Sequence, residues 1–196
     1  MISVYNIKPK FQALLRPILL KLHAWGVSPN GLTLAAIALS FVAGLLFWQY
    51  DNPIAYLIVA AALLLRMALN ALDGMMARTY KMQSRLGEVL NEAGDVVSDL
   101  FIFFPFLKLP FINTYLLFAF IILAVINEFA GVLGKAMGGE RRYEGPMGKS
   151  DRALFLGLIC IVLYFWPAAQ QYMNITFGLA ILLLLISTFT RLKKAL

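Results

Sequence analysis

The sequence contains little of the chemistry that cysteine, histidine and charged side chains supply. With Cys160 as its only cysteine, an intrachain disulfide and a cysteine-based zinc cluster are both excluded. The only histidine, His23, lies in a basic segment beside an apolar one, which favours an interfacial role over a catalytic one. Only 14% of the 196 residues are charged whereas 61% are hydrophobic, and soluble domains have about 45–50% apolar residues. This composition predicts an integral membrane protein.

Six apolar segments approach the length of about 20 residues that a membrane helix needs. They cover residues 31–49, 53–79, 86–107, 111–135, 152–168 and 172–191. No internal repeat, low-complexity tract or second domain interrupts them. The expected fold is therefore an all-α integral membrane protein, a single membrane domain over residues 1–196. Its core is a bundle of six transmembrane helices over residues 31–191.

An amphipathic segment, residues 7–25, precedes this bundle. Its apolar residues recur at helical spacing, while basic residues lie elsewhere around the helix; the apolar set is Phe11, Leu14, Leu15, Ile18, Leu19 and Leu22. We expect a helix lying in the membrane interface, with Pro17 as the place where it can break. After the turn at residues 26–30, Asn30 is the expected cap of the first membrane helix.

The 17 basic residues exceed the 10 acidic ones, giving a net charge of +7. They flank the apolar segments, so they indicate membrane topology and contact with lipid headgroups rather than nucleic-acid binding. They gather before the first segment, between the second and third, between the fourth and fifth, and at the chain end, whereas the alternate loops hold only Lys108. The positive-inside rule then places both termini and residues 70–99 in the cytoplasm, with the chain in the inner membrane.

The stretch from residue 70 to residue 99 carries most of the acidic residues expected at membrane depth. Its polar and small residues form two helical stripes, spaced i, i+3, i+7 and then every four residues; the stripes are Asn70, Asp73 and Ala77, then Gly87, Asn91, Asp95 and Asp99. Facing each other across a short connection, they would line a pocket with oxygen atoms. Such oxygens bind hard cations such as Mg²⁺ or Mn²⁺, and acids inside a bilayer are functional candidates by default.

This stretch resembles the signature of the CDP-alcohol phosphatidyltransferase family, D-x2-D-G-x2-A-R-x8-G-x3-D-x3-D. All spacings and six of the eight fixed positions match; the matching series is Asn70, Asp73, Gly74, Ala77, Arg78, Gly87, Asn91 and Asp95. Residues 28–33, with Asn30 and Thr33, resemble the family's opening of the first membrane helix, and residues 148–152 resemble its basic element before the fifth. The resemblance covers nearly the whole chain and is closest to a little-characterised bacterial branch.

The resemblance implies an enzyme that moves a substituted phosphoryl group from a CDP-alcohol, often CDP-diacylglycerol, to an acceptor hydroxyl and releases CMP. It implies a homodimer in which two divalent metals bridge the aspartates and the pyrophosphate, with the last aspartate, Asp95, as general base. Asp73 and Asp95 are then the candidate catalytic residues, and together with Asn70 and Asn91 they are the candidate metal ligands.

The residues themselves support a phosphate-binding reading. Gly74, Ala77 and Gly87 lack bulk and would let a nucleotide approach the helices, and Arg78 can form a forked contact with phosphate. A second basic cluster on the same side suits a phosphate on the acceptor or on a lipid headgroup; it consists of Arg141, Arg142, Lys149 and Arg152.

Two departures from the family pattern leave alternatives open. Asn70 and Asn91 stand where the family has aspartates, so a site of charge −4 becomes one of −2 unless Glu92 or Asp99 restores charge. One or two metal ions therefore remain open. A catalytically reduced relative that binds CDP-lipid without turnover is one rival reading. A small cation or lipid transporter is another, although the chain lacks the inverted repeats and broken helices common in transporters. The sequence does not identify the acceptor.

Overall fold

The computed structural model describes residues 8–196, within which every regular element is a helix. The elements are α1 (Lys8–Ala24), α2 (Pro29–Gln49), α3 (Ile54–Thr79), α4 (Arg85–Phe103), η2 (Phe104–Lys108), α5 (Thr114–Ala136), α6 (Lys149–Phe165), η3 (Pro167–Tyr172) and α7 (Met173–Ala195). The two η elements are short 3₁₀ helices, the first extending α4 and the second leading into α7. Each of the six predicted segments forms a helix, α2 to α7. Ile7, the first residue of the predicted interfacial segment, lies outside the described residues.

Side chains at the turns set where several helices begin. The Ser28 hydroxyl accepts a hydrogen bond of 3.1 Å from the Gly31 amide, and Pro29 occupies the first turn of α2, where its missing N–H costs nothing. The predicted cap, Asn30, is therefore wrong: Ser28 is the cap and Asn30 lies inside the helix. Ser84 caps α4 in the same way, through the amide of Gly87.

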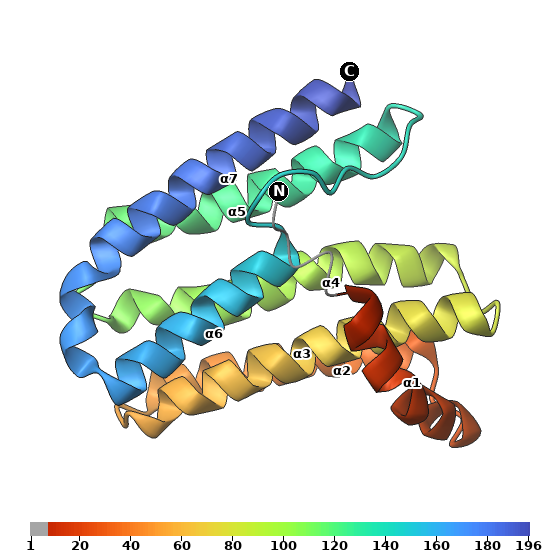
Figure 1. Ribbon diagram of the computed structural model, residues 1–196, viewed down its shortest axis with the longest axis horizontal. Coiled ribbons are helices and arrows are strands. Elements are labelled where there is room, and N and C mark those ends of the chain that lie inside the picture. Colours follow the sequence, from red (N-terminus) through yellow and green to blue (C-terminus); the bar gives the residue numbers. More distant parts are fainter. Residues whose placement is uncertain (1–7) are drawn as a thin grey trace.

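The helices pack as two groups (Figure 1). In one group α2 packs on α3 and α4, α3 packs on α6, and α1 lies against α3; in the other, α5 and α7 run side by side. Aromatic rings join the groups at the end where α5 begins, because Phe120 packs on Phe103, Phe155 and Phe177 with ring centroids 5.3, 6.0 and 5.3 Å away. Toward the opposite end, where α3 turns into α4, a second apolar cluster joins α1 to α2 and α3, while polar side chains meet between α3 and α4.

Helix α1 runs without interruption through Pro17, so the predicted break does not occur. Its apolar residues divide between two faces. Leu15 and Leu19 are buried in a cluster with residues of α2 and α3, whereas Leu14 is 72% exposed and Ile18 47% exposed. The outward face is what an interfacial helix would present to lipid, and that placement stays a prediction.

Within residues 8–196, four helical stretches are long and apolar enough to cross a membrane; they are Pro29–Gln49, Ile54–Thr79, Thr114–Ala136 and Pro167–Ala195. The two remaining helices, α4 and α6, fall short for different reasons. Helix α4 carries several charged residues, two of which, Asp95 and Asp99, are buried, and α6 has 17 residues. Their role as spans remains a prediction, and the surrounding helices shield the α4 acids.

Candidate active site

The two polar stripes face each other, as their spacing predicts. Asn70 and Asp73 lie on α3, and Asn91 and Asp95 lie on α4. The amide nitrogen of Asn70 donates a hydrogen bond of 2.8 Å to Asp95 Oδ1, and that of Asn91 donates one of 3.4 Å to Asp73 Oδ2. Each motif asparagine thus contacts the motif aspartate on the opposite helix.

Asp73 keeps one carboxylate oxygen without a partner. Its side chain is 4% exposed, and Oδ2 accepts a hydrogen bond of 2.8 Å from the Thr33 hydroxyl on α2. The other oxygen, Oδ1, is buried and has no hydrogen-bond partner. A buried carboxylate oxygen without a donor carries a desolvation cost that a bound cation would offset.

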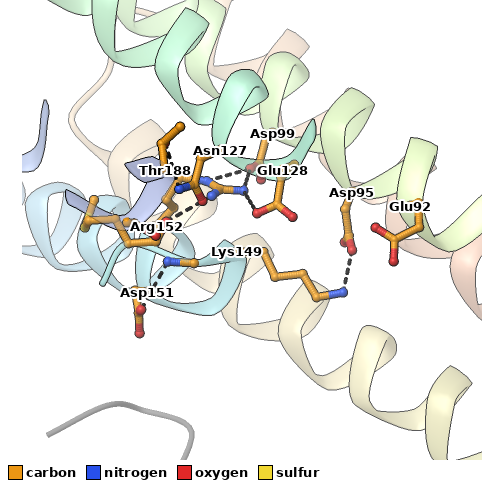
Figure 2. A network of polar contacts seen from close by, with 12 residues as sticks. Glu92, Asp95, Asp99, Asn127, Glu128, Lys149, Asp151, Arg152 and Thr188 are labelled. Carbon is orange, nitrogen blue, oxygen red and sulfur yellow. Dashed lines mark hydrogen bonds and ion pairs between the residues drawn. The ribbon is translucent and has the colours of Figure 1, made fainter. Parts of the chain in front are cut away.

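Asp95 is surrounded by donors. Besides Asn70, it contacts the guanidinium of Arg66, with 3.7 Å between Nη2 and Oδ1, and the ammonium of Lys149 at Oδ2. Figure 2 shows the Lys149 side chain extending from the start of α6 to this carboxylate. The Lys149 side chain is 30% exposed, whereas that of Asp95 is buried.

These residues fit a divalent cation only with the help of the asparagines. Among residues 8–196, no group of three or more histidine, cysteine, aspartate or glutamate side chains could hold a metal ion. A site built on the free Asp73 oxygen would therefore need the amide oxygens of Asn70 and Asn91, which are ligands that hard cations accept. Asp95 Oδ2 is occupied by Lys149, and its role as a metal ligand stays a prediction.

The acids expected to replace the missing charge are engaged elsewhere. Asp99 pairs with Arg66 at 2.7 Å and with Arg152 at 2.6 Å, and it is buried. Glu92 pairs with Arg141 at 2.6 Å. The hypothesis that Glu92 or Asp99 restores charge to the metal site is therefore wrong for this arrangement, because arginines already neutralise both carboxylates. Arg66 is a structural partner of carboxylates, since it contacts both Asp95 and Asp99.

The small and polar residues predicted to bind substrate surround the α3–α4 turn. Gly87 lies against Asn30, since a Cβ on the glycine would sit 2.8 Å from Asn30 Oδ1. The guanidinium of Arg78 folds back over Gly74, with 3.2 Å from Nη1 to the position of a Cβ. Ala77 lies on the same helix, one turn after Asp73. The structure thus gathers Asn30, Thr33, Gly74, Arg78 and Gly87 on α2, α3 and α4.

The second basic cluster divides into accessible and inaccessible cations. Arg152 is 0% exposed, and its guanidinium contacts Asp99, Glu128 and the Met147 carbonyl. The structure therefore does not present Arg152 to a substrate, contrary to the expectation that it binds phosphate. Lys149 and Arg142 keep partial exposure.

Arg141 lies in the segment between α5 and α6 and is held by two carboxylates. Burial alone would lower the pKa of its guanidinium, but Glu128 and Glu92 raise that pKa above its usual range, so the group stays charged. The guanidinium also lies over the Tyr143 ring, 4.3 Å from its centroid. These contacts fix Arg141 in a defined position near the end of α5.

Sequence reasoning missed one buried cation, Arg191. It was assigned to the basic chain end, but it is 1% exposed and donates 2.8 and 3.2 Å hydrogen bonds to the carbonyls of Asn127 and Glu144. The signal that could have found it is its place three residues, about one helical turn, after Thr188. In the structure, Thr188 accepts a hydrogen bond from Asn127 across the α5–α7 interface, so Asn127 makes an interhelical contact.

The spacing of the facing polar residues agrees with a family model. That model, described as CDP-alcohol phosphatidyltransferase, matches residues 26–189 and so takes in every helix of the site. This chain belongs to the CDP-alcohol phosphatidyltransferase family. The family comprises transferases of phospholipid biosynthesis.

Two related sequences cover much of the chain. Inner membrane protein YnbA of Escherichia coli (strain K12) is 44% identical over 194 residues, which are 99% of this chain and 96% of that protein. An archaetidylinositol phosphate synthase of Aeropyrum pernix is 30% identical over 137 residues, covering 69% of this chain and 68% of that enzyme. The first of these relationships spans nearly the whole chain and therefore includes the α3–α4 motif.

Solved structures share the fold. The phosphatidylinositol phosphate synthase of Mycobacterium tuberculosis with CDP-DAG bound superposes with a TM-score of 0.74 at 21% identity, covering 91% of this chain and 92% of that one. The same enzyme with manganese and citrate also gives a TM-score of 0.74. The helix arrangement in Figure 1 is therefore a fold that solved structures also show.

Proposed function

We propose that this chain transfers a substituted phosphoryl group from a CDP-alcohol, with CDP-diacylglycerol as the first candidate, to an acceptor hydroxyl. The observation that carries the proposal is the unpartnered, buried Oδ1 of Asp73 inside a family motif whose two halves face each other. Binding of CDP-DAG and of manganese by a structural neighbour supports the choice of donor and of metal class.

In this reaction the acceptor oxygen forms a bond to the phosphorus that carries the donor alcohol. The bond between that phosphorus and the oxygen bridging to CMP breaks, CMP leaves with the bonding electrons, and the acceptor proton passes to Asp95. Arg66 lies beside Asp95, with 3.7 Å between Nη2 and Oδ1. Thr33 orients Asp73 by its hydrogen bond.

We propose that Mg²⁺ or Mn²⁺ is held by Asp73, Asp95, Asn70 and Asn91. Such an ion supplies charge neutralisation for the pyrophosphate and stabilises the departing oxygen. A single ion is favoured over two, because Asp73 Oδ1 is the only oxygen of the two aspartates that lacks a hydrogen bond or ion pair within the described chain. Gly74, Ala77 and Gly87 leave room for the nucleotide, and Arg78 lies beside it.

We further propose that α4 and α6 cross the membrane with the other four helices, which gives six spans and places both termini and the site in the cytoplasm. The basic residues on the site side and the nearly uncharged opposite loops support this orientation. The likeness to an inner membrane protein supports the inner membrane as location. A homodimer is the expected assembly.

The test is release of CMP by the purified protein from CDP-diacylglycerol, across a panel of acceptors, with and without Mn²⁺. Names of two relatives put inositol phosphate on that panel, beside inositol, glycerol, glycerol 3-phosphate and serine. Asp73→Asn and Asp95→Asn should abolish release. Asp51→Asn is the matched control, because its side chain is 93% exposed and lies in the loop at the other end of the bundle. Equal rates in all four proteins would contradict the proposed site.

One observation favours a second candidate, binding of CDP-lipid without turnover. Three of the four carboxylate oxygens of Asp73 and Asp95 already have partners, which are the two asparagine amides, the Thr33 hydroxyl and the Lys149 ammonium. This arrangement is stable without a metal. A protein of this kind would bind CDP-diacylglycerol yet release no CMP with any acceptor. Parallel measurement of nucleotide binding and CMP release separates the two functions.

A further inference from the structure

Glu128 lies at the centre of a buried arginine cluster that the proposed transfer reaction does not use. Its carboxylate is 2.6 Å from Arg141 Nη2, 3.0 Å from Arg152 Nη2 and 3.6 Å from Arg191 Nη1. These arginines come from the α5–α6 segment, α6 and α7, while Glu128 lies on α5 and is 4% exposed. Three guanidinium groups around one site form the arrangement that proteins use for a phosphate.

This cluster borders the reactive acids. Arg152, which contacts Glu128, also pairs with Asp99, and Asp99 shares Arg66 with Asp95. Figure 2 shows Lys149 and Arg152, three residues apart on α6, reaching Asp95 and Glu128 respectively. When the hydroxyl of an acceptor contacts Asp95, the remainder of the acceptor molecule therefore lies next to the arginine cluster.

The cluster is a fixed part of the fold. The segment carrying Arg141 is tied to α5 by a hydrogen bond of 2.9 Å from the Arg142 amide to the Gly131 carbonyl. Arg191 is held by two backbone carbonyls as well as by Glu128. Backbone contacts therefore hold the Arg191 guanidinium and the segment that carries Arg141, and the Glu128 carboxylate lies between the guanidinium groups.

The three arginines around this space already have carboxylate partners. Arg141 is shared by Glu92 and Glu128, and Arg152 by Asp99 and Glu128. Of the predicted basic cluster, Arg142 alone has no ion pair with a carboxylate among residues 8–196. A phosphate entering the cluster would have to displace Glu128 and leave that buried carboxylate without a partner, which is strongly unfavourable.

We propose that Glu128 is an internal substitute for an acceptor phosphate, and that this protein consequently transfers its phosphoryl group to an alcohol that carries no phosphate. The inference rests on the proposed transfer function and narrows its substrate class. Arg142 and Lys149 remain available to bind the phosphates of the CDP donor. Glu128 is then a specificity-determining residue, because its charge repels a phosphorylated acceptor while its arginines stay neutralised.

The first test compares matched acceptors, glycerol against glycerol 3-phosphate and inositol against inositol phosphate, by CMP release from CDP-diacylglycerol with Mn²⁺. Faster release with the unphosphorylated member of a pair supports the inference. Faster release with the phosphorylated member overturns it while upholding the transferase function. No release with any acceptor counts against the transferase function. The role of Glu128 is then decided by whether Glu128→Gln binds sulfate more tightly than the unmodified protein does.

The second test uses inorganic sulfate as a probe and does not depend on activity. Glu128→Gln keeps the side-chain size but removes the charge, so the three arginines should now take up the anion. We expect sulfate to raise the thermal stability of this variant and to bind it roughly tenfold or more tightly than it binds the unmodified protein. Glu88→Gln is the control, because it removes an exposed carboxylate paired with Lys135 on the same side.

Either of two results in this second test overturns the inference. One is sulfate binding to the unmodified protein as tight as to Glu128→Gln. The other is a Glu128→Gln variant that folds, as judged by a single thermal transition, yet gains no affinity for sulfate. Should Glu128→Gln unfold without salt, its recovery on adding sulfate, absent with the same ionic strength of chloride, still supports the inference, and equal failure in both salts contradicts it.

Discussion

Asn70 donates a hydrogen bond of 2.8 Å to Asp95 across the α3–α4 interface. Asn70, which stands where the family pattern has an aspartate, is therefore in direct contact with Asp95, the last aspartate of that pattern. Asn91 has the same relation to Asp73, at 3.4 Å. An amide in these positions can donate to a carboxylate without metal, whereas an aspartate there would repel it. The two asparagines thus allow the site to hold together in the metal-free state.

The double variant Asn70→Asp/Asn91→Asp should bind Mn²⁺ more tightly than the unmodified protein, because a carboxylate ligand brings charge that an amide lacks. The same change should lower thermal stability without metal, since four acids then face one another. Metal titration by calorimetry and melting with and without Mn²⁺ measure both effects. Unchanged metal affinity in a folded variant would show that neither asparagine binds the metal and that both serve helix packing.

Asp73→Ala should abolish metal-dependent binding of a CDP-alcohol, because it removes the buried Oδ1 that has no hydrogen-bond partner. The cavity left is small and the Thr33 hydroxyl loses an acceptor, so the fold should persist. Calorimetric titration of the nucleotide with Mn²⁺ gives the affinity, and Asp51→Ala serves as the exposed control. Binding unaffected by Asp73→Ala would be incompatible with a metal at this residue.

Lys149 and Arg152 should respond differently to replacement by glutamine. Arg152→Gln leaves Asp99 and Glu128 without their shared partner, and breaking a buried ion pair costs about 3–5 kcal/mol. Lys149→Gln changes a partly exposed side chain and should reduce donor affinity and CMP release with a much smaller loss of stability. Thermal unfolding in detergent, paired with the release assay, separates the effects; equal destabilisation would refute the distinction.

Gly44→Ala should weaken the packing of α2 against α4. A Cβ on Gly44 would sit 2.0 Å from the Phe101 carbonyl oxygen, so the helices must separate, at a cost of about 1–3 kcal/mol for overpacking. Gly157→Ala is the matched control on α6, because a Cβ there meets nothing within 4 Å. Melting temperatures in one detergent compare the two, and the prediction fails if both variants melt alike.

Labelling of single cysteines tests the six-span topology. After Cys160→Ala, a cysteine at Gln83 in the α3–α4 connection should react with a membrane-impermeant maleimide only when the cytoplasmic face is open. A cysteine at Asp51, which is exposed in the α2–α3 loop, should react in intact cells whose outer membrane is permeabilised. Labelling of both positions from the same side would contradict the orientation drawn from the basic residues.

Much of the fold follows from local pattern. The six apolar segments became α2 to α7, and the spacing of Asn70 with Asp73 and of Asn91 with Asp95 placed each pair on one helix face. Helical periodicity is a property of neighbouring residues, so it can be read without knowing how the chain packs. The predicted break at Pro17 was wrong because local pattern does not show how a helix packs. The buried Leu15 and Leu19 on either side of Pro17 pack on other helices, and α1 continues through the proline.

The partners of the charged residues depend on contacts between distant parts of the chain. The sequence shows acids and arginines in excess of what a bilayer tolerates unpaired, and so determines that they must meet. Which ones meet was decided by the packing of α4, α5, α6 and α7. That packing joins Asp99 to Arg152 and Glu128 to Arg191 while leaving an oxygen of Asp73 free. Sequence alone therefore determined the helices and the polar motif, whereas only the tertiary structure separated the carboxylates neutralised by arginines from the Asp73 carboxylate, whose Oδ1 has no hydrogen-bond partner.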